Sequence, residues 1–282
     1  MSLLRAICSL GLVGALMAAE SYAAVIEIQP AKDNTLIQST DPGAQRSNGQ
    51  GDIFSGRTGQ NPPTISVRRG LIQFDIAGSL PAGVIITSVT LTIPGVQGRS
   101  GDPTTTLHRV LQDWGEGASE FIGGQGDGAE DNDATWLYRF YNKANPTESL
   151  AWSTPGGDFV SAASGSSVIS DDLGGGQLFS WSSAGMVDDV RFWLANPSQN
   201  FGWLILGDES MGQTAKRFNS GESAVPPVLA VEYVPEPSTV VLALAALGTI
   251  AAAGGNRNRR SRHRTTKAGC EIAGTDSAPR SD

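Results

Sequence analysis

Few side chains able to perform catalysis occur in the central part of the chain. Residues 24–236 contain one histidine, His108, and no cysteine, since Cys8 and Cys270 lie near the two ends. Thiol catalysis and zinc sites built on paired histidines are therefore excluded there by residue type. A serine hydrolase triad would need His108, but no nucleophile-elbow sequence accompanies it. We therefore expect a protein that is not an enzyme and has no catalytic residues.

Carboxylates are the remaining side chains that could bind a metal ion or perform catalysis. The densest acidic run, DGAEDND, contains Asp127, Asp131 and Asp133 in a Gly-rich segment. Oxygen ligands in a flexible loop suit Ca²⁺, but Tyr138 stands at the twelfth position, where an EF-hand has glutamate. We interpret the run as a solvated loop and keep these three aspartates as the alternative Ca²⁺ site. No other metal or cofactor is expected, and a glycosidase carboxylate pair cannot be chosen from so many acids.

Charge separates the central part from the end of the chain. Residues 24–236 carry 24 Asp and Glu against 12 Lys and Arg, a formal net charge of −12, whereas the whole chain has −8. We expect no binding to nucleic acid, because phosphate backbones are bound by clustered Lys and Arg.

Hydrophobic periodicity predicts a β-rich fold. Val89, Leu91 and Ile93 alternate with threonines, and Ile72, Phe74 and Ile76 alternate with polar residues, as in strands with one buried face. Turn-forming Gly and Pro residues separate these and the other expected strands, which favours an all-β sandwich or jelly roll. The other expected strands cover residues 25–28, 35–38, 104–111, 177–181, 202–206 and 228–233.

One short helix interrupts this pattern. In SSAGMVDDVRFWLANP, the apolar residues Met186, Val187, Val190, Trp193 and Leu194 recur at spacings of three and four. Ser182 or Ser183 can cap the helix and Pro197 ends it. We interpret it as a helix that caps an open end of the sandwich.

The amino end predicts a signal peptide over residues 1–23. Arg5 precedes an uncharged run over 6–19, and small residues flank Tyr22 at the expected cleavage site, after Ala23 or Ala24. The alternative is a buried terminal helix.

The carboxyl end combines three features in order. Pro235-Glu236-Pro237 is followed by an uncharged segment to residue 256, long enough for a transmembrane-like helix, and then by a basic cluster. Alone, the segment predicts a membrane anchor with the arginines in the cytoplasm. The combined order over 234–264 resembles the PEP-CTERM sorting signal, which implies an exosortase as processing partner, and residues 265–282 are expected to be a disordered tail. The basic cluster consists of Arg257, Arg259, Arg260, Arg262 and Arg264.

The region between the two ends contains a series of distinctive stretches, namely DNTLIQ (33–38), RRGLIQFDI (68–76), DWGEG (113–117), ATW (134–136) and the stretch from GWLILGDE to AVEY over 202–233. In this order they resemble a DNRLRE-type module, related to carbohydrate-binding module family 96. The resemblance implies a β-sandwich of a secreted, polysaccharide-associated protein over 24–233. Trp114 and Trp136 are expected to be core or loop anchors, and Arg217 and Glu222 flank a turn across which they could pair.

These features together predict an exported, non-catalytic module at the cell surface or in the extracellular matrix. Its C-terminal helix would hold it transiently in the inner membrane before processing. The resemblance implies binding of polysaccharide through basic residues without fixing their positions, and we choose Arg57, Arg69 and His108 as the candidates. The alternatives are a structural envelope or matrix protein without a ligand of its own, and a polysaccharide-degrading enzyme.

Overall fold

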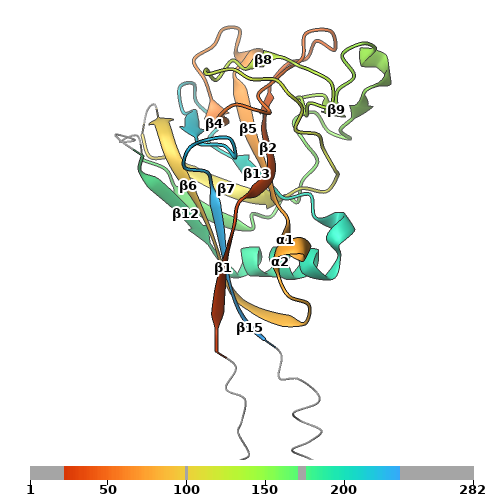
Figure 1. Cartoon of the computed structure of the whole chain (residues 1–282). Helices are drawn as coiled ribbons and strands as arrows, with labels where there is room; N and C mark the ends of the chain where they lie inside the picture. Colours follow the sequence, from red (N-terminus) through yellow and green to blue (C-terminus); the bar gives the residue numbers. More distant parts are fainter. Residues whose placement is uncertain (1–21, 99–100, 171–175, 236–282) are drawn as a thin grey trace, which may run out of the picture. The chain divides into compact units, whose positions relative to one another are not determined.

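Antiparallel strands are the main regular structure of the described chain (Figure 1). The computed structural model describes residues 22–98, 101–170 and 176–235, and we call residues 22–235 the body. Its strands are β1 (Ala24–Ile28), β2 (Pro30–Ile37), β3 (Arg46–Ser47), β4 (Ile53–Arg57), β5 (Val67–Phe74), β6 (Val84–Gly98), β7 (Thr104–Arg109), β8 (Asp127–Gly128), β9 (Tyr138–Phe140), β10 (Leu150–Ala151), β11 (Gly165–Val168), β12 (Leu178–Ser182), β13 (Trp203–Leu206), β14 (Lys216–Phe218) and β15 (Val228–Pro235). The helices are α1 (Ile76–Ser79) and α2 (Ala184–Ala195), with single 3₁₀ turns at Pro63–Ile65, Pro146–Glu148 and Pro197–Gln199.

One curled sheet contains most of these strands. Its order is β1-β15-β6-β14-β4-β5-β13-β7-β11, with β12 also paired to β6 and β2 also paired to β5. The long strand β6 pairs with β15, β12 and β14. Because its partners change along its length, the sheet curls, and two of its parts face each other across a core. The expected predominance of β structure is confirmed, in the form of one curled antiparallel sheet, and the sandwich or jelly roll stays a prediction.

The main core lies between the two facing parts of the sheet. In β6, Val89, Leu91 and Ile93 are buried and the intervening threonines are half-buried, so the predicted alternation is confirmed. They share one cluster with Trp181 of β12 and Trp203 of β13. Burial of such large apolar side chains is the main source of stability in a body that has no disulfide.

The prediction of one buried face is wrong for β5. Ile72 and Phe74 enter the main core, but Leu71 is fully buried on the opposite face, in a second cluster. The second face is covered by residues 111–160, whose Trp114 and Trp136 pack there. Ile76 is not in the strand, because Asp75 caps α1 by accepting a hydrogen bond from the Gly78 amide (2.9 Å).

The expected capping helix corresponds to α2. Ser183 Oγ accepts a hydrogen bond from the Met186 amide (3.1 Å), and α2 ends before Pro197. Trp193 from α2 meets Trp203 edge to face, with ring centroids 4.6 Å apart. Asp189 from the same helix accepts from Trp203 Nε1 (2.8 Å) and pairs with Arg109 (3.1 Å), so α2 is attached to the sheet by both apolar and polar contacts.

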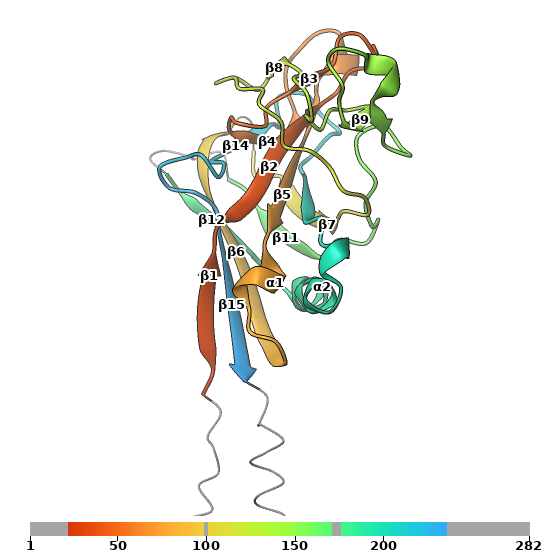
Figure 2. The ribbon, with the colours of Figure 1, turned by 45° about the vertical axis from the view of Figure 1, so that its right-hand side comes forward.

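The first and last strands of the body lie side by side (Figure 2). Ala24 of β1 is opposite Tyr233 of β15, and β15 is also paired with β6 along its whole length. The described chain therefore begins and ends at the same edge of the body. The predicted signal peptide falls on residues 1–23, most of which lie outside the described residues.

We expect replacement of Trp193 by alanine to lower the free energy of unfolding by about 3–5 kcal/mol, because it leaves a large cavity between α2 and the sheet. Urea unfolding measures this. Leu111→Ala is the matched control: Leu111 is half exposed and its truncation should change stability by less than about 0.5 kcal/mol. Equal effects of the two substitutions would contradict the described packing of α2.

Candidate functional site

A pocket with both polar and apolar lining residues lies beside the end of β2. Its volume is about 470 Å³, and its lining includes Gln38, Arg46, Gln60, Arg68 and Gln125. Two guanidinium groups and three amides give it many hydrogen-bond donors, and Asp41 is the carboxylate among its lining residues. We call this site the arginine pocket. Arg46 and Gln125 come to it from segments far apart in the sequence, joined by the short pairing of β3 with β8.

Arg68 forms the fixed wall of the arginine pocket. Its side chain is almost fully buried and donates to the carbonyls of Ile65 and Val67 (2.8 Å each), to Gln60 Oε1 and to the Gly124 carbonyl. Burial, with a smaller contribution from Arg46, lowers the pKa of Arg68 to about 10. The group is therefore still positively charged at neutral pH, and no carboxylate among the described residues pairs with it directly.

Arg46 is the accessible cation of the pocket. Its Nε and Nη2 donate to the carbonyls of Gln125 (2.8 Å) and Gly126 (2.6 Å), which orient the side chain. A guanidinium has five N–H groups, so the remaining ones can donate to a bound molecule. Arg46 lies in β3, and the loop over 123–126 that orients it carries no local sequence signal for this contact.

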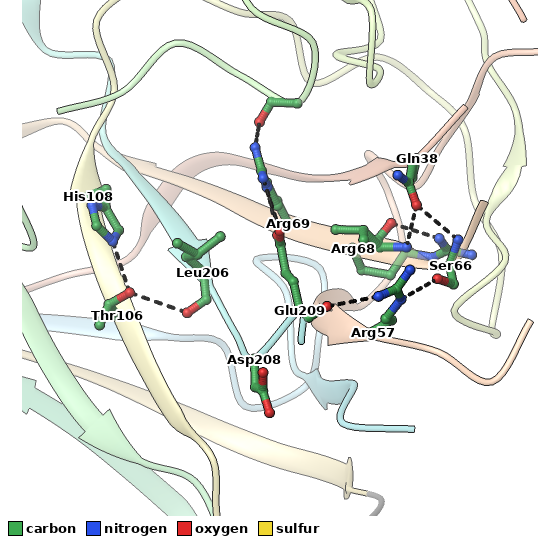
Figure 3. A network of polar contacts seen from close by, with 12 residues as sticks. Gln38, Arg57, Ser66, Arg68, Arg69, Thr106, His108, Leu206, Asp208 and Glu209 are labelled. Carbon is green, nitrogen blue, oxygen red and sulfur yellow. Dashed lines mark hydrogen bonds and ion pairs between the residues drawn. The ribbon is translucent and has the colours of Figure 1, made fainter. Parts of the chain in front are cut away.

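Two of the predicted carbohydrate-binding residues, Arg57 and Arg69, meet at Glu209 (Figure 3). Arg69 donates to both carboxylate oxygens of Glu209 (2.7 and 3.0 Å) and to the Gly156 carbonyl (2.8 Å). Arg57 donates to the Glu209 carbonyl (3.1 Å), to Ser66 Oγ (2.8 Å) and to a turn carbonyl. Both arginines therefore join loops to the sheet through internal acceptors.

The third predicted residue, His108, lies in β7 close to Arg69. The ring of Phe159 is 5.2 Å from the His108 ring and 5.6 Å from the Arg69 guanidinium carbon. His108 is buried, with Nδ1 2.9 Å from the Val160 carbonyl and Nε2 2.9 Å from Thr106 Oγ1 (Figure 3). A carbonyl only accepts, so Nδ1 carries the proton and the ring is held in one tautomer.

The predicted Ca²⁺ candidates are separated by their environments. Asp133 is buried and accepts a hydrogen bond from the Glu130 amide (2.6 Å). Asp127 and Asp131 are exposed. Asp127 accepts a hydrogen bond from the Gly128 amide, and Asp131 accepts one from the Lys143 amide (both 2.7 Å). Within the described ranges, the acids whose oxygens come close enough to hold a metal are a different group, namely Asp33, Glu116 and Glu222.

Two other sequence expectations have clear outcomes. Trp114 and Trp136 are buried in the second core, so their prediction as anchors is confirmed.

The expected pairing of Arg217 with Glu222 is wrong, because Arg217 pairs with Asp52. Arg217 lies in β14, which is aligned with β4, and Asp52 immediately precedes β4, so the sheet register brings them together.

The sorting triplet begins inside the last strand. Val234 and Pro235 of β15 are opposite Ile85 and Val84 of β6, so the strand runs two residues beyond its predicted end. Glu236, Pro237, the apolar segment and the basic cluster lie outside the described residues. Within the described ranges, no helix has the length and apolar character needed to cross a membrane.

Comparison with known proteins identifies this carboxyl end. Residues 234–260 match the PEP-CTERM protein-sorting motif. Such a motif indicates an exported protein that an exosortase processes and sorts to the cell surface. No family match supports the resemblance of the body to a DNRLRE-type module, and no curated protein matches the sequence.

The buried carboxyl group of Asp133 should make stability depend on pH. Burial raises its pKa from an ordinary 3.8 to about 6, so the folded state binds the proton more tightly than the unfolded state. Below about pH 4 the protonated group contributes about 2–3 kcal/mol to the free energy of unfolding, and this contribution is lost as the pH rises through 6. Measured by urea unfolding, the difference between wild type and Asp133→Asn should follow this curve. A difference in unfolding free energy between the two proteins that stays constant from pH 4 to 7 would contradict the raised pKa of Asp133.

Proposed function

We propose that the chain is an exported, non-catalytic β protein that acts at the cell surface or in the extracellular matrix and associates there with polysaccharide. The sorting motif supports the location. The arginine pocket is the single observation that carries the binding activity, because it combines a buried charge, an accessible cation and several amides in one concave site.

The chemistry of the pocket suits a hydroxyl-rich or carboxylate-bearing sugar. Guanidinium and amide groups donate to sugar hydroxyls and pair with uronic or sulfate groups. The lining residues include Ile37 and Ile65 but no aromatic ring, so binding would depend on hydrogen bonds instead of stacking. The acidic net charge of the body weakens its attraction for strongly anionic chains, which favours weak binding strengthened by many copies at a surface.

Of the three predicted residues, Arg57 supports this site indirectly. Gln38 of the pocket accepts hydrogen bonds from the amides of Ser66 and Val67 (3.2 and 3.1 Å), and Ser66 also contacts Arg57 (Figure 3). Arg57 therefore helps to position the wall of the pocket, whereas the side-chain hydrogen bonds of Arg69 and His108 lie outside it. His108 is engaged on both nitrogens, and no carboxylate in the described part of the chain pairs with it, which favours a binding protein over a hydrolase.

A structural protein without a ligand is the second candidate. The absence of cysteine over residues 24–236 and the two buried cores would suit a rigid matrix component equally well. The binding experiment below distinguishes the two functions. An enzyme would instead release reducing ends or unsaturated sugars when the purified protein is incubated with polysaccharides.

We expect Arg46→Ala to weaken polysaccharide binding by roughly tenfold or more, because a charge-assisted hydrogen bond contributes about 1.5–3 kcal/mol. Affinity electrophoresis in gels containing neutral or acidic polysaccharides measures this. Arg139→Ala removes the same charge at β9, outside the pocket, and should leave mobility unchanged. Wild-type protein that no polysaccharide retards would refute binding and leave the structural function.

Processing at the carboxyl end is tested by intact mass analysis of protein recovered from its own host. We expect loss of the signal peptide and of the segment after the sorting triplet. Glu236→Ala should cause the tail to be retained, whereas Glu232→Ala, an acid four residues earlier in β15, should be processed normally. Unprocessed wild-type protein in the cytosol would contradict export and sorting.

A further inference from the structure

Three carboxylates from distant segments meet at one edge of the body. Asp33 lies in β2, Glu116 follows β7, and Glu222 precedes β15. One oxygen from each lies within 4.8 Å of the other two. This group, which we call the carboxylate triad, includes none of the aspartates that the sequence suggested for Ca²⁺, and the function proposed above makes no use of it.

Backbone hydrogen bonds hold the triad in place. Asp33 Oδ2 accepts from the Gly221 amide (2.7 Å), and the Asp33 amide donates to Glu116 Oε1 (2.9 Å). Asn34 Nδ2 donates to the Glu116 carbonyl (2.7 Å), which fixes the same loop against β2. The three acids therefore converge because β2 is joined to both loops, and their mutual approach is built into the fold.

The second oxygen of Asp33 has no hydrogen-bond partner. The side chain is 0 % exposed, and Oδ1 is buried without a donor among the described residues. A buried carboxylate oxygen of this kind is costly, and a bound ion is one of the few things that explains it. Asp33 therefore contributes to the triad a carboxylate that has one unsatisfied oxygen.

The neighbouring cations are already used by other acids. Lys32 Nζ contacts Asp113 Oδ1 (2.9 Å) and the Trp114 carbonyl, and Arg217 pairs with Asp52. The negative charge of the triad is therefore only partly balanced by the side chains around it.

We propose that Asp33, Glu116 and Glu222 bind a hard divalent cation, with Ca²⁺ as its identity. An all-oxygen set without histidine or cysteine excludes the usual zinc ligands and suits Ca²⁺. Glu222 is exposed and Glu116 half-buried, so the cation is reached from solvent and water completes its coordination. Bound there, it joins β2 to the loop before β15 and to the loop that follows β7.

The test uses the full exported protein stripped of metal with a chelator. Ca²⁺ should raise the thermal midpoint and give a saturable calorimetric titration. Glu222→Gln, an exposed substitution that preserves folding, should weaken Ca²⁺ binding about tenfold or more by removing one charged ligand, and Asp33→Asn should remove the midpoint shift. Asp131→Asn is the matched control in the other acidic loop and should bind Ca²⁺ like wild type.

Three results would overturn the proposal. The first is wild-type protein whose midpoint and heats do not respond to Ca²⁺. The second is a Ca²⁺ response that survives unchanged in Glu222→Gln and Asp33→Asn. The third is a response lost in Asp131→Asn, which would move the site to the Gly-rich loop. A larger midpoint shift with Mg²⁺ than with Ca²⁺ at equal concentration would overturn the identity of the ion.

Discussion

The pairing of β15 with β6 and β1 is the interaction on which the rest of the body depends. Every residue of β15 has a partner in β6, and five of them also have partners in β1. Leu229 and Val231 from this strand are fully buried in the main core. Because the last strand lies between the first strand and the longest one, the sheet is complete only when the whole body is available to fold.

This arrangement brings the fold and the sorting motif together without a linker. Pro235 is both the last residue of β15 and the first residue of the sorting triplet, and a proline is tolerated at a strand end because it lacks an amide to donate. The body also has no cysteine over residues 24–236, so its folding outside the cytosol requires no oxidation. Its stability comes from two apolar cores on opposite faces of β5 and β13.

Local patterns in the sequence predicted much of this fold. The alternation in β6 and the Ser183 cap of α2 are set by neighbouring residues, and both were predicted correctly. The burial of β5 on both faces was not predicted, because the residues that pack on its second face come from the largely irregular segment 111–160. The carboxylate triad was missed for the same reason: Asp33 is 83 residues from Glu116 and 188 from Gly221. Such contacts depend on strand register, which no local pattern encodes.

Amide hydrogen exchange of the exported protein tests the central pairing most directly. The account predicts that peptides from residues 228–235 exchange as slowly as peptides from residues 89–93 of β6, because the two strands open together. Exchange of residues 228–235 at the rate of the exposed turn around Pro146–Glu148, while β6 stays protected, would contradict it.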